Sequence, residues 1–143
     1  MNEQKRYFWD AIQTLSQAGL LPHVVLIGSW AEYIYEVTGY FNGFQANLRT
    51  RDADFLVKNI RKPKQKVDLY KYFSEKGFEP QIDYISGVTK FAKGGAIEVE
   101  FIVSEMGRGQ TDSYDVKPFG IRAEGLRHMG IILSNIIELK YEL

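Results

Sequence analysis

The sequence predicts an α/β (α+β) fold in which helices flank a mixed, mostly antiparallel β-sheet. In the first half of the chain, helical stripes of apolar residues alternate with short apolar runs, as in domains that pack helices on a sheet. In the second half, short runs of β-favouring residues follow one another with glycine-containing turns between them. The 143 residues suffice for one buried core and are too few for two. We therefore expect a single domain over residues 1–143.

The first two predicted elements are a surface helix and a strand. Within residues 3–18 the apolar side chains, among them Phe8 and Leu15, recur at spacings of three and four, which is typical of one helical face. Val24–Ile27 is a continuous apolar run of the kind found in strands that are buried on both faces. We expect the helix to cover a sheet that contains this strand.

A strand-to-helix turn follows at Gly28-Ser29. Ser29 and Glu32 have the spacing of a capping box, so we expect a helix from Trp30 to about Val37 with Ser29 as its N-cap. The first N–H groups of such a helix favour an anion, and a glycine before them lets the anion come close. The turn therefore predicts a phosphate site, in which the serine hydroxyl either bonds the phosphate or caps the helix.

A loop, an interior strand and another helix occupy the middle of the chain. Residues 38–50 carry glycines, asparagines and aromatics without periodicity, which predicts a loop. Asp52–Val57 predicts an interior strand that begins with polar residues, and a basic turn follows over residues 58–66. The apolar residues between Val67 and Gly77 share a helical face, and the glycine ends that helix.

The second half predicts a meander of antiparallel strands. Its runs of β-favouring residues span Glu79–Ile85, Val88–Lys93 and Ile97–Val103, with Ser-Gly and Gly-Gly turns between them.

Beyond the meander, the sequence predicts a loop, two edge strands and a final helix. Residues 107–115 are glycine-rich and polar and predict the loop, and residues 117–121 and 129–133 predict the edge strands. The final helix would begin with an asparagine cap at Asn135 and be cut short by the end of the chain after about two turns.

Composition narrows the class of protein. Lys and Arg number 18 and so do Asp and Glu, so no net charge draws the chain to nucleic acid or membrane, and an anionic ligand must be held by local geometry. The absence of cysteine removes disulfides and cysteine nucleophiles, and it suits a reducing compartment. No apolar run approaches the ~18 residues of a membrane span. We expect a cytoplasmic protein.

Asp52 and Asp54 predict a metal site. They alternate across one residue of a strand, so both side chains leave the same face, with Cα atoms roughly 7 Å apart. Two carboxylates at ~4 Å repel by about 4 kcal/mol near a protein surface, and a bound divalent cation reverses that cost. Magnesium prefers oxygen ligands and typically takes one or two carboxylates together with phosphate oxygens.

A site with two ions needs a third carboxylate, because ions ~4 Å apart share ligands. In the run from Ile97 to Val103, Glu98 and Glu100 share the face opposite the apolar side chains, so at least one of them points away from the core. Spacing does not choose between the two glutamates.

Three segments, in this order, resemble the nucleotidyltransferase superfamily that contains the family-X DNA polymerases, kanamycin-type antibiotic transferases and the abortive-infection type of bacterial toxin. Residues 26–29 (LIGS) resemble its hydrophobic-Gly-Ser motif, residues 49–56 (RTRDADFL) resemble its Arg-Thr-x-Asp-x-Asp-hydrophobic motif, and residues 99–102 (VEFI) fall where a third acid sits. Residues 133–140 are similar to the start of a helix in the abortive-infection group, which the chain resembles most.

The resemblance implies the nucleotidyltransferase fold and a two-metal transfer of a nucleoside monophosphate from a triphosphate to an acceptor hydroxyl. Two Mg²⁺ (or Mn²⁺) ions would be held by Asp52, Asp54 and Glu100, which are also the implied catalytic residues. The acceptor would be a small molecule, an RNA end or a protein, and a partner chain is possible. The implied nucleotide-binding residues are Gly28, Ser29, Arg49, Thr50 and Lys140. The third acid is a glutamate here, where the family more often has aspartate.

A second hypothesis keeps the fold without turnover, as a nucleotide-binding or regulatory module such as one component of a toxin–antitoxin pair. Glu100 distinguishes the two hypotheses. If this glutamate lies within metal reach of Asp52 and Asp54, the enzyme is favoured, and if it pairs with a lysine elsewhere, the module is favoured. The aromatic side chains after Ser29, Trp30 among them, either stack on a base or pack against the sheet, and we favour packing.

Overall fold

Strand β5 is the centre of a seven-stranded sheet whose main path runs in the order β1-β2-β5-β4-β3. The computed structural model describes residues 1–48, 50–105, 113–127 and 129–141. In chain order the elements are α1 (Glu3–Gln17), the short 3-10 helix η1 (Leu21–His23), β1 (Val24–Ile27), α2 (Ser29–Thr38), β2 (Asp52–Val57), α3 (Leu69–Glu75), β3 (Glu79–Ile82), β4 (Thr89–Lys93), β5 (Ile97–Ser104), β6 (Ser113–Val116), the 3-10 helix η2 (Lys117–Phe119), β7 (Ile121–Leu126) and α4 (Gly130–Leu133).

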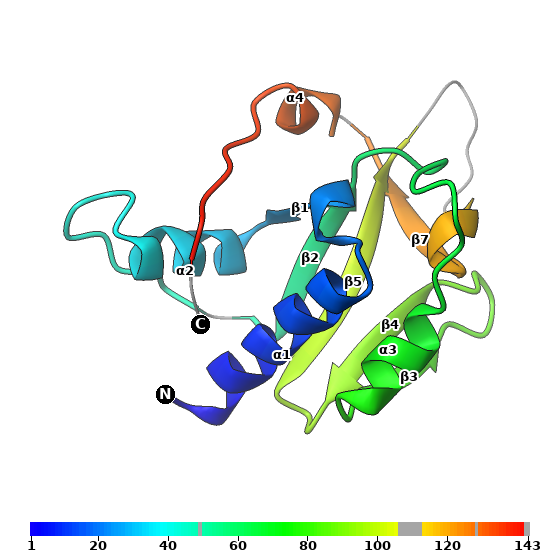
Figure 1. Ribbon diagram of the computed structural model, residues 1–143, viewed down its shortest axis with the longest axis horizontal. Helices are drawn as coiled ribbons and strands as arrows, with labels where there is room; N and C mark the ends of the chain where they lie inside the picture. The colour runs from blue at the N-terminus through cyan, green and yellow to red at the C-terminus, as the bar shows by residue number, and fades with distance from the viewer. Residues whose placement is uncertain (49, 106–112, 128, 142–143) are drawn as a thin grey trace.

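The sheet is mixed, which corrects the expectation of a mostly antiparallel one. Its central strand β5 runs parallel to β2 on one edge and parallel to β7 on the other. The antiparallel pairs β1-β2, β4-β5, β3-β4 and β6-β7 surround it. Because α3 and the β3-β4 hairpin intervene between β2 and β5 (Figure 1), the chain returns to the end of the sheet where β2 began. The α/β class is confirmed.

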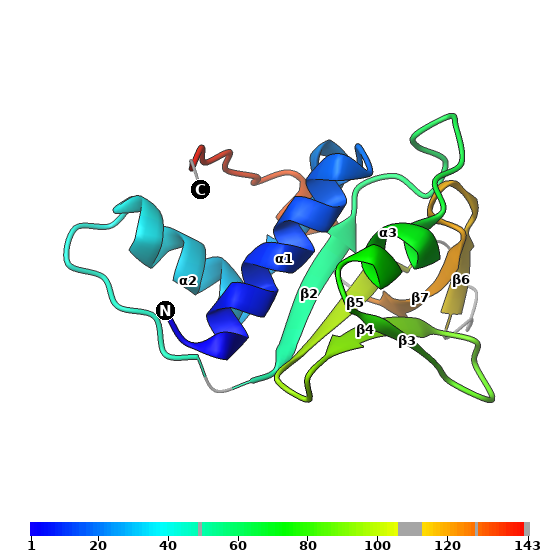
Figure 2. The ribbon, with the colours of Figure 1, turned by 60° about the horizontal axis from the view of Figure 1, so that its bottom comes forward.

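Strand β5 is shared between two neighbours along one edge. Residues 97–100 pair with β4, and residues 102–104 pair with β7. The sheet therefore divides beyond Glu100, and the β3-β4 and β6-β7 hairpins diverge from this point (Figure 2). Before this division, residues 98–100 of β5 are flanked by β2 and β4. The charged side chains of the polar face of the sheet lie in this part.

Helices α1 and α3 cover one face of the sheet (Figure 2), while α2 follows β1 at the edge of the sheet (Figure 1). The amphipathic stripe predicted for residues 3–18 is confirmed, with the Asn2 side chain accepting from the Lys5 backbone N–H at 2.8 Å as the N-cap of α1. None of the described helices has the length and apolar character that crossing a lipid bilayer requires. The core between helices and sheet includes Phe8, Leu15, Trp30, Phe55, Phe73, Phe91, Phe101 and Phe119.

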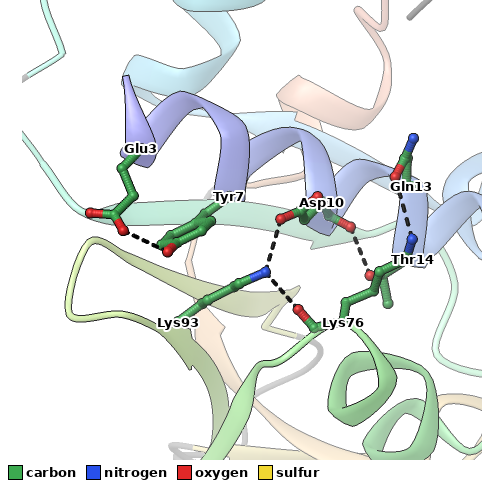
Figure 3. Close-up of polar contacts among 7 residues, drawn as sticks. All are labelled: Glu3, Tyr7, Asp10, Gln13, Thr14, Lys76 and Lys93. Atoms are coloured by element: carbon green, nitrogen blue, oxygen red, sulfur yellow. Dashed lines mark hydrogen bonds and ion pairs between the residues drawn. The ribbon is translucent and has the colours of Figure 1, made fainter. Parts of the chain in front are cut away.

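A polar cluster joins α1 to β4 and to the end of α3 (Figure 3). The Lys93 ammonium lies 2.9 Å from an Asp10 carboxylate oxygen and donates to the Lys76 carbonyl at 2.7 Å. It also sits 4.6 Å from the centroid of the Tyr7 ring. Lys93 projects from β4 toward α1. Because side chains alternate along a strand, Lys90, three residues earlier, projects from the opposite face.

Strand β1 corrects one detail of the prediction. The apolar run Val24–Ile27 forms a strand as expected, but this strand lies at the edge of the sheet, and of its residues only Val24 is buried. Its outward side adjoins a cavity of about 430 Å³ between α1, α2 and the C-terminal segment. The run is apolar because Val24 and Leu26 pack on the core and because Val24, Val25 and Leu26 also line this cavity.

The C-terminal third departs most from the sequence-based expectation. Within the expected loop, residues 113–115 belong to strand β6, while residues 107–112 lie outside the described residues. Residues 117–119 form a 3-10 turn in place of an edge strand, and β7 begins only at Ile121. The expected edge strand at 129–133 is the short helix α4, and residues 135–141 form no helix. Proline at 118 lacks the N–H that a strand pairing uses.

Candidate functional site

Four carboxylates form two rows on the polar face of the sheet. The parallel register of β2 and β5 sets Asp52 opposite Glu98 and Asp54 opposite Glu100. The alternate residues of both strands point the other way into the core, where Ala53 and the residues around it are fully buried. We call Asp52, Asp54, Glu98 and Glu100 the acidic array. The predicted common face of Asp52 and Asp54 is confirmed.

The acids interact strongly because the array is partly buried. Burial, a hydrogen bond with Glu100 and the negative charge of Glu100 and Asp52 raise the pKa of Asp54 from its ordinary value of 3.8 to about 7. Burial and a hydrogen bond with Asp52 raise the pKa of Glu98 as well. Without a cation, Asp54 therefore keeps its proton at pH values at which an isolated carboxyl has already lost it.

The array has the donors that a divalent cation needs. Asp52, Glu98 and Glu100 each offer a carboxylate oxygen, and these oxygens lie within 4.8 Å of one another. Asp54 Oδ1 is buried, and no N–H or O–H group of the described residues donates to it. Clustered carboxylate oxygens, one of them without a protein donor, suit Mg²⁺ or Mn²⁺. The residues present therefore fit the metal that the resemblance implies, and both glutamates are within reach of Asp52.

The Gly28-Ser29 turn adjoins the array, since Ile27 pairs with Asp54 across β1 and β2. Gly28 has φ of +77°, a conformation that side chains rarely adopt, and a Cβ atom built there would lie 3.8 Å from Asp54 Oδ2. A glycine here keeps the backbone close to the acid.

Ser29 corrects the predicted capping box. Gly28 is the N-cap of α2, and Ser29 is already the first helical residue. The Ser29 hydroxyl is buried and has no hydrogen-bond partner among the described residues. A buried hydroxyl without a partner costs about 1–3 kcal/mol, so this oxygen and the first N–H groups of the ten-residue helix α2 are available to an anionic ligand.

Of the other predicted nucleotide-binding residues that the structure describes, Thr50 lies beside Asp52, and Lys140 lies in a different part of the molecule. The Thr50 hydroxyl accepts the backbone N–H of Asp52 at 3.0 Å and so fixes the start of β2. Arg49 lies outside the described residues. Lys140 lines the cavity beside β1, in a segment anchored by stacking of Tyr141 on Trp9 with ring centroids 5.1 Å apart. None of the four acids lines that cavity.

Lys90 is the residue of this face that the sequence analysis missed. It lies opposite Glu100 in the β4-β5 register, and its Nζ is 2.6 Å from Glu100 Oε1. The hydrogen bond to Glu100 raises the pKa of Lys90, and so do the charges of Glu100, Glu98 and Asp52. Alternation with the buried Phe91 places Lys90 on the polar face, but only the strand order brings it to the array.

A second pocket of about 430 Å³ opens beside this lysine. It lies at the division of the sheet, and its lining includes charged and polar residues: Gln81, Ile82, Asp83, Ser86, Val88, Lys90 and Glu124. The pocket and the acidic array therefore share Lys90 as a common wall.

The raised pKa of Asp54 predicts an unusual dependence of stability on pH. Between about pH 4 and pH 7 the folded chain keeps a proton that the unfolded chain has lost, so this carboxyl makes the free energy of unfolding fall as pH rises through that window. At pH 8 without metal, Asp54→Asn should stabilise the fold by about 1–2 kcal/mol, after a discount for solvent screening of a half-exposed group.

Thermal unfolding in EDTA at pH 5 and pH 8 checks this expectation. The gain in stability of Asp54→Asn over wild type should be larger at pH 8 than at pH 5. Asp115→Asn, an exposed acid on β6, should show no such difference. An equal effect of Asp54→Asn at both pH values would mean that Asp54 titrates normally.

Comparison with known families agrees with this geometry. A family model described as "Nucleotidyltransferase" matches residues 7–139 of the chain. The match covers the strand-glycine-serine-helix turn, the Asp-x-Asp strand and the strand with the two glutamates. No curated protein and no solved structure matches the chain.

The protein thus belongs to a class in which a mixed α/β sheet carries clustered carboxylates beside a helix N-terminus. More particularly, the chain belongs to the nucleotidyltransferase family, which confirms the superfamily indicated by the sequence motifs.

Proposed function

We propose that this chain is a metal-dependent nucleotidyltransferase that moves a nucleoside monophosphate from a triphosphate to an acceptor hydroxyl, with pyrophosphate leaving. The observation that carries the proposal is the acidic array, which adjoins an unpartnered Ser29 hydroxyl at the N-terminus of α2 in a chain of this family. We propose further that it has the nucleotidyltransferase fold, that residues 1–143 are one domain and that it acts in the cytoplasm.

Asp52, Asp54 and Glu100 are the proposed ligands of two Mg²⁺ or Mn²⁺ ions, and Glu98 adds a fourth carboxylate within reach. When bound, such ions neutralise phosphate charge and lower the pKa of the acceptor oxygen. Asp52 or Glu100 then takes the acceptor proton, because each presents carboxylate oxygens on the open face. Partial burial excludes water from part of each carboxylate, which strengthens the attraction of the array for a cation.

The triphosphate is proposed to lie over the Gly28-Ser29 turn. Gly28 presents no side chain toward Asp54, so a phosphate group can approach both the metal ligands and the helix N–H donors. The Ser29 hydroxyl gains in the phosphate the hydrogen-bond partner that it lacks in the free chain. Roles in nucleotide binding for Arg49, Thr50 and Lys140 stay predictions. For Lys140 to reach the triphosphate, the C-terminal segment would have to leave the cavity beside β1.

The acceptor is a hydroxyl of a small molecule, an RNA end or a protein. The pocket beside Lys90 borders the array on the side away from Gly28, which gives an acceptor room near Glu100. We also propose that, within the family, the chain is related most closely to the abortive-infection type of bacterial toxin.

One observation favours a second candidate function. Glu100 is paired with Lys90, as expected for a degenerate module that binds nucleotide or a partner chain without turnover, for example within a toxin–antitoxin pair. In that case the ammonium permanently replaces a metal ion at the third carboxylate, and the chain binds a triphosphate without releasing pyrophosphate.

Calorimetry tests the proposed site. ATP, CTP, GTP and UTP are titrated with Mg²⁺ into wild type and into Asp52→Asn/Asp54→Asn. At least one triphosphate should bind wild type, and the double variant should bind it at least about tenfold more weakly, because the metal that joins nucleotide to protein is lost. Asp115→Asn/Glu75→Gln, which removes two exposed acids, should bind like wild type. Absence of binding for all four triphosphates would refute the enzyme proposal for this chain.

A further inference from the structure

The two lysines of β4 face opposite sides of the sheet. Lys93 points toward α1 and is held by Asp10 and the Lys76 carbonyl (Figure 3), which gives it a structural role. Lys90 points to the polar face, where it meets the acidic array. Its side chain is 41% exposed, whereas that of Glu100 is only 16% exposed. The ammonium therefore reaches inward from the solvent edge to the more buried carboxylate.

Glu100 lies between a cation and another acid. One of its oxygens lies 2.6 Å from Lys90 Nζ, and Asp54 is its partner in the register of β2 and β5. Glu98 and Asp52 form the other row of this register. The ammonium that contacts the array therefore lies at the Glu100 end. Among the described residues, no ion pair involves Asp52 or Glu98.

A divalent cation and the Lys90 ammonium compete for one Glu100 oxygen, Oε1. An ammonium at hydrogen-bond distance occupies the space in which a metal would coordinate the same oxygen at about 2.0–2.1 Å. The repulsion between a single and a double positive charge a few ångströms apart is strong at a partly buried site. A metal ion at Oε1 therefore requires Lys90 to move, and the ammonium repels a metal ion at the other oxygen of Glu100.

We propose that the Lys90 ammonium occupies the Glu100 end of the acidic array and thereby restricts the nucleotide-free chain to one divalent cation, bound at the Asp52–Glu98 row. This inference rests on the proposed metal-dependent function and deepens it. Lys90 is a positioning residue that sets how many ions the free site holds, and a second ion enters only when Lys90 leaves Glu100. Two metal ions and the Lys90–Glu100 pair are then successive states of one site.

The number of bound ions can be measured directly with Mn²⁺. Electron paramagnetic resonance follows the loss of the free Mn²⁺ signal as the nucleotide-free full chain is added at pH 8. Wild type is compared with Lys90→Met and Lys90→Gln, two neutral variants that keep part of the side-chain length. Lys71→Met, which removes an exposed lysine from α3, is the matched control. Circular dichroism and thermal unfolding establish that each variant is folded.

Wild type and Lys71→Met should each bind one Mn²⁺ per chain. The neutral Lys90 variants should bind two, or bind the first at least about tenfold more tightly, because the competing charge is gone. If Lys90→Met and Lys90→Gln are folded and match wild type in both number and affinity, the inference about Lys90 is wrong while the metal site of the proposed function stands. If neither wild type nor the variants bind Mn²⁺, the inference and the metal-dependent function are both wrong.

Discussion

Asp52→Asn and Asp54→Asn should each lower the rate of pyrophosphate release by on the order of 10³-fold. An asparagine keeps the size of the side chain and removes the charge that binds a divalent cation, so the stabilisation of the reacting phosphate is lost with little change in packing. Both residues lie on the open face of β2 with Ala53 buried between them. Neither substitution therefore disturbs the core.

Pyrophosphate release is measured with the triphosphate that binds most tightly, using total bacterial RNA and a bacterial protein fraction as sources of acceptor hydroxyls. Glu75→Gln, on the opposite side of the sheet in α3, controls for the loss of one negative charge and should keep the wild-type rate. If Asp54→Asn released pyrophosphate as fast as wild type, the acidic array would not be the catalytic centre. Triphosphate binding without any release by wild type would favour the degenerate module.

Trp30→Ala should lower the free energy of unfolding by about 3–5 kcal/mol. Trp30 is fully buried, stacks on Phe8 with ring centroids 4.5 Å apart and meets Tyr33 edge to face at 5.5 Å. Truncation leaves a large cavity where α1 and α2 meet. Because Trp30 directly follows Ser29, its packing also fixes the N-terminal turn of α2, so triphosphate binding should weaken together with stability.

Trp30→Phe separates the role of packing from that of the indole N–H. The indole Nε1 is buried without a hydrogen-bond partner among the described residues. Phenylalanine removes this polar group while keeping an aromatic ring, so its cost should stay below about 1.5 kcal/mol. Urea unfolding measures both variants against Glu32→Ala, an exposed change on α2 that should stay within about 0.5 kcal/mol of wild type. A nearly unchanged stability of Trp30→Ala would contradict the described core.

Local patterns in the sequence located most elements of the first two-thirds of the chain. The apolar stripe of α1, the runs that become β1 and β2, and the three meander strands follow from side-chain periodicity, which a helix or strand requires wherever one face is buried. Two of the expected strands were too long. The first was expected to end at Ile85, but β3 ends at Ile82, and the second was expected to begin at Val88, but β4 begins at Thr89.

Errors concentrated where local patterns compete. The Ser-x-x-Glu spacing predicted a cap at Ser29, but Gly28 takes the capping position because its positive φ lets the chain turn sharply out of β1. The apolar residues of 129–133 suit a strand or a helix, and the segment is too short for periodicity to decide. Residues 136–141 line the cavity beside β1 in a non-helical conformation. A helix of this length is too short to be stable alone, so these contacts decide the conformation.

The sequence by itself determined which acids share a face, because alternation along a strand depends on the backbone alone. It therefore fixed the pairing of Asp52 with Asp54, and of Glu98 with Glu100, as neighbours on one side of their own strands. Only the tertiary structure decided that the two strands lie side by side and in parallel, which turns two separate pairs into one array. The same strand order brought Lys90 to Glu100. Contacts between strands depend on the path of the whole chain between them, and no local pattern of residues records that path.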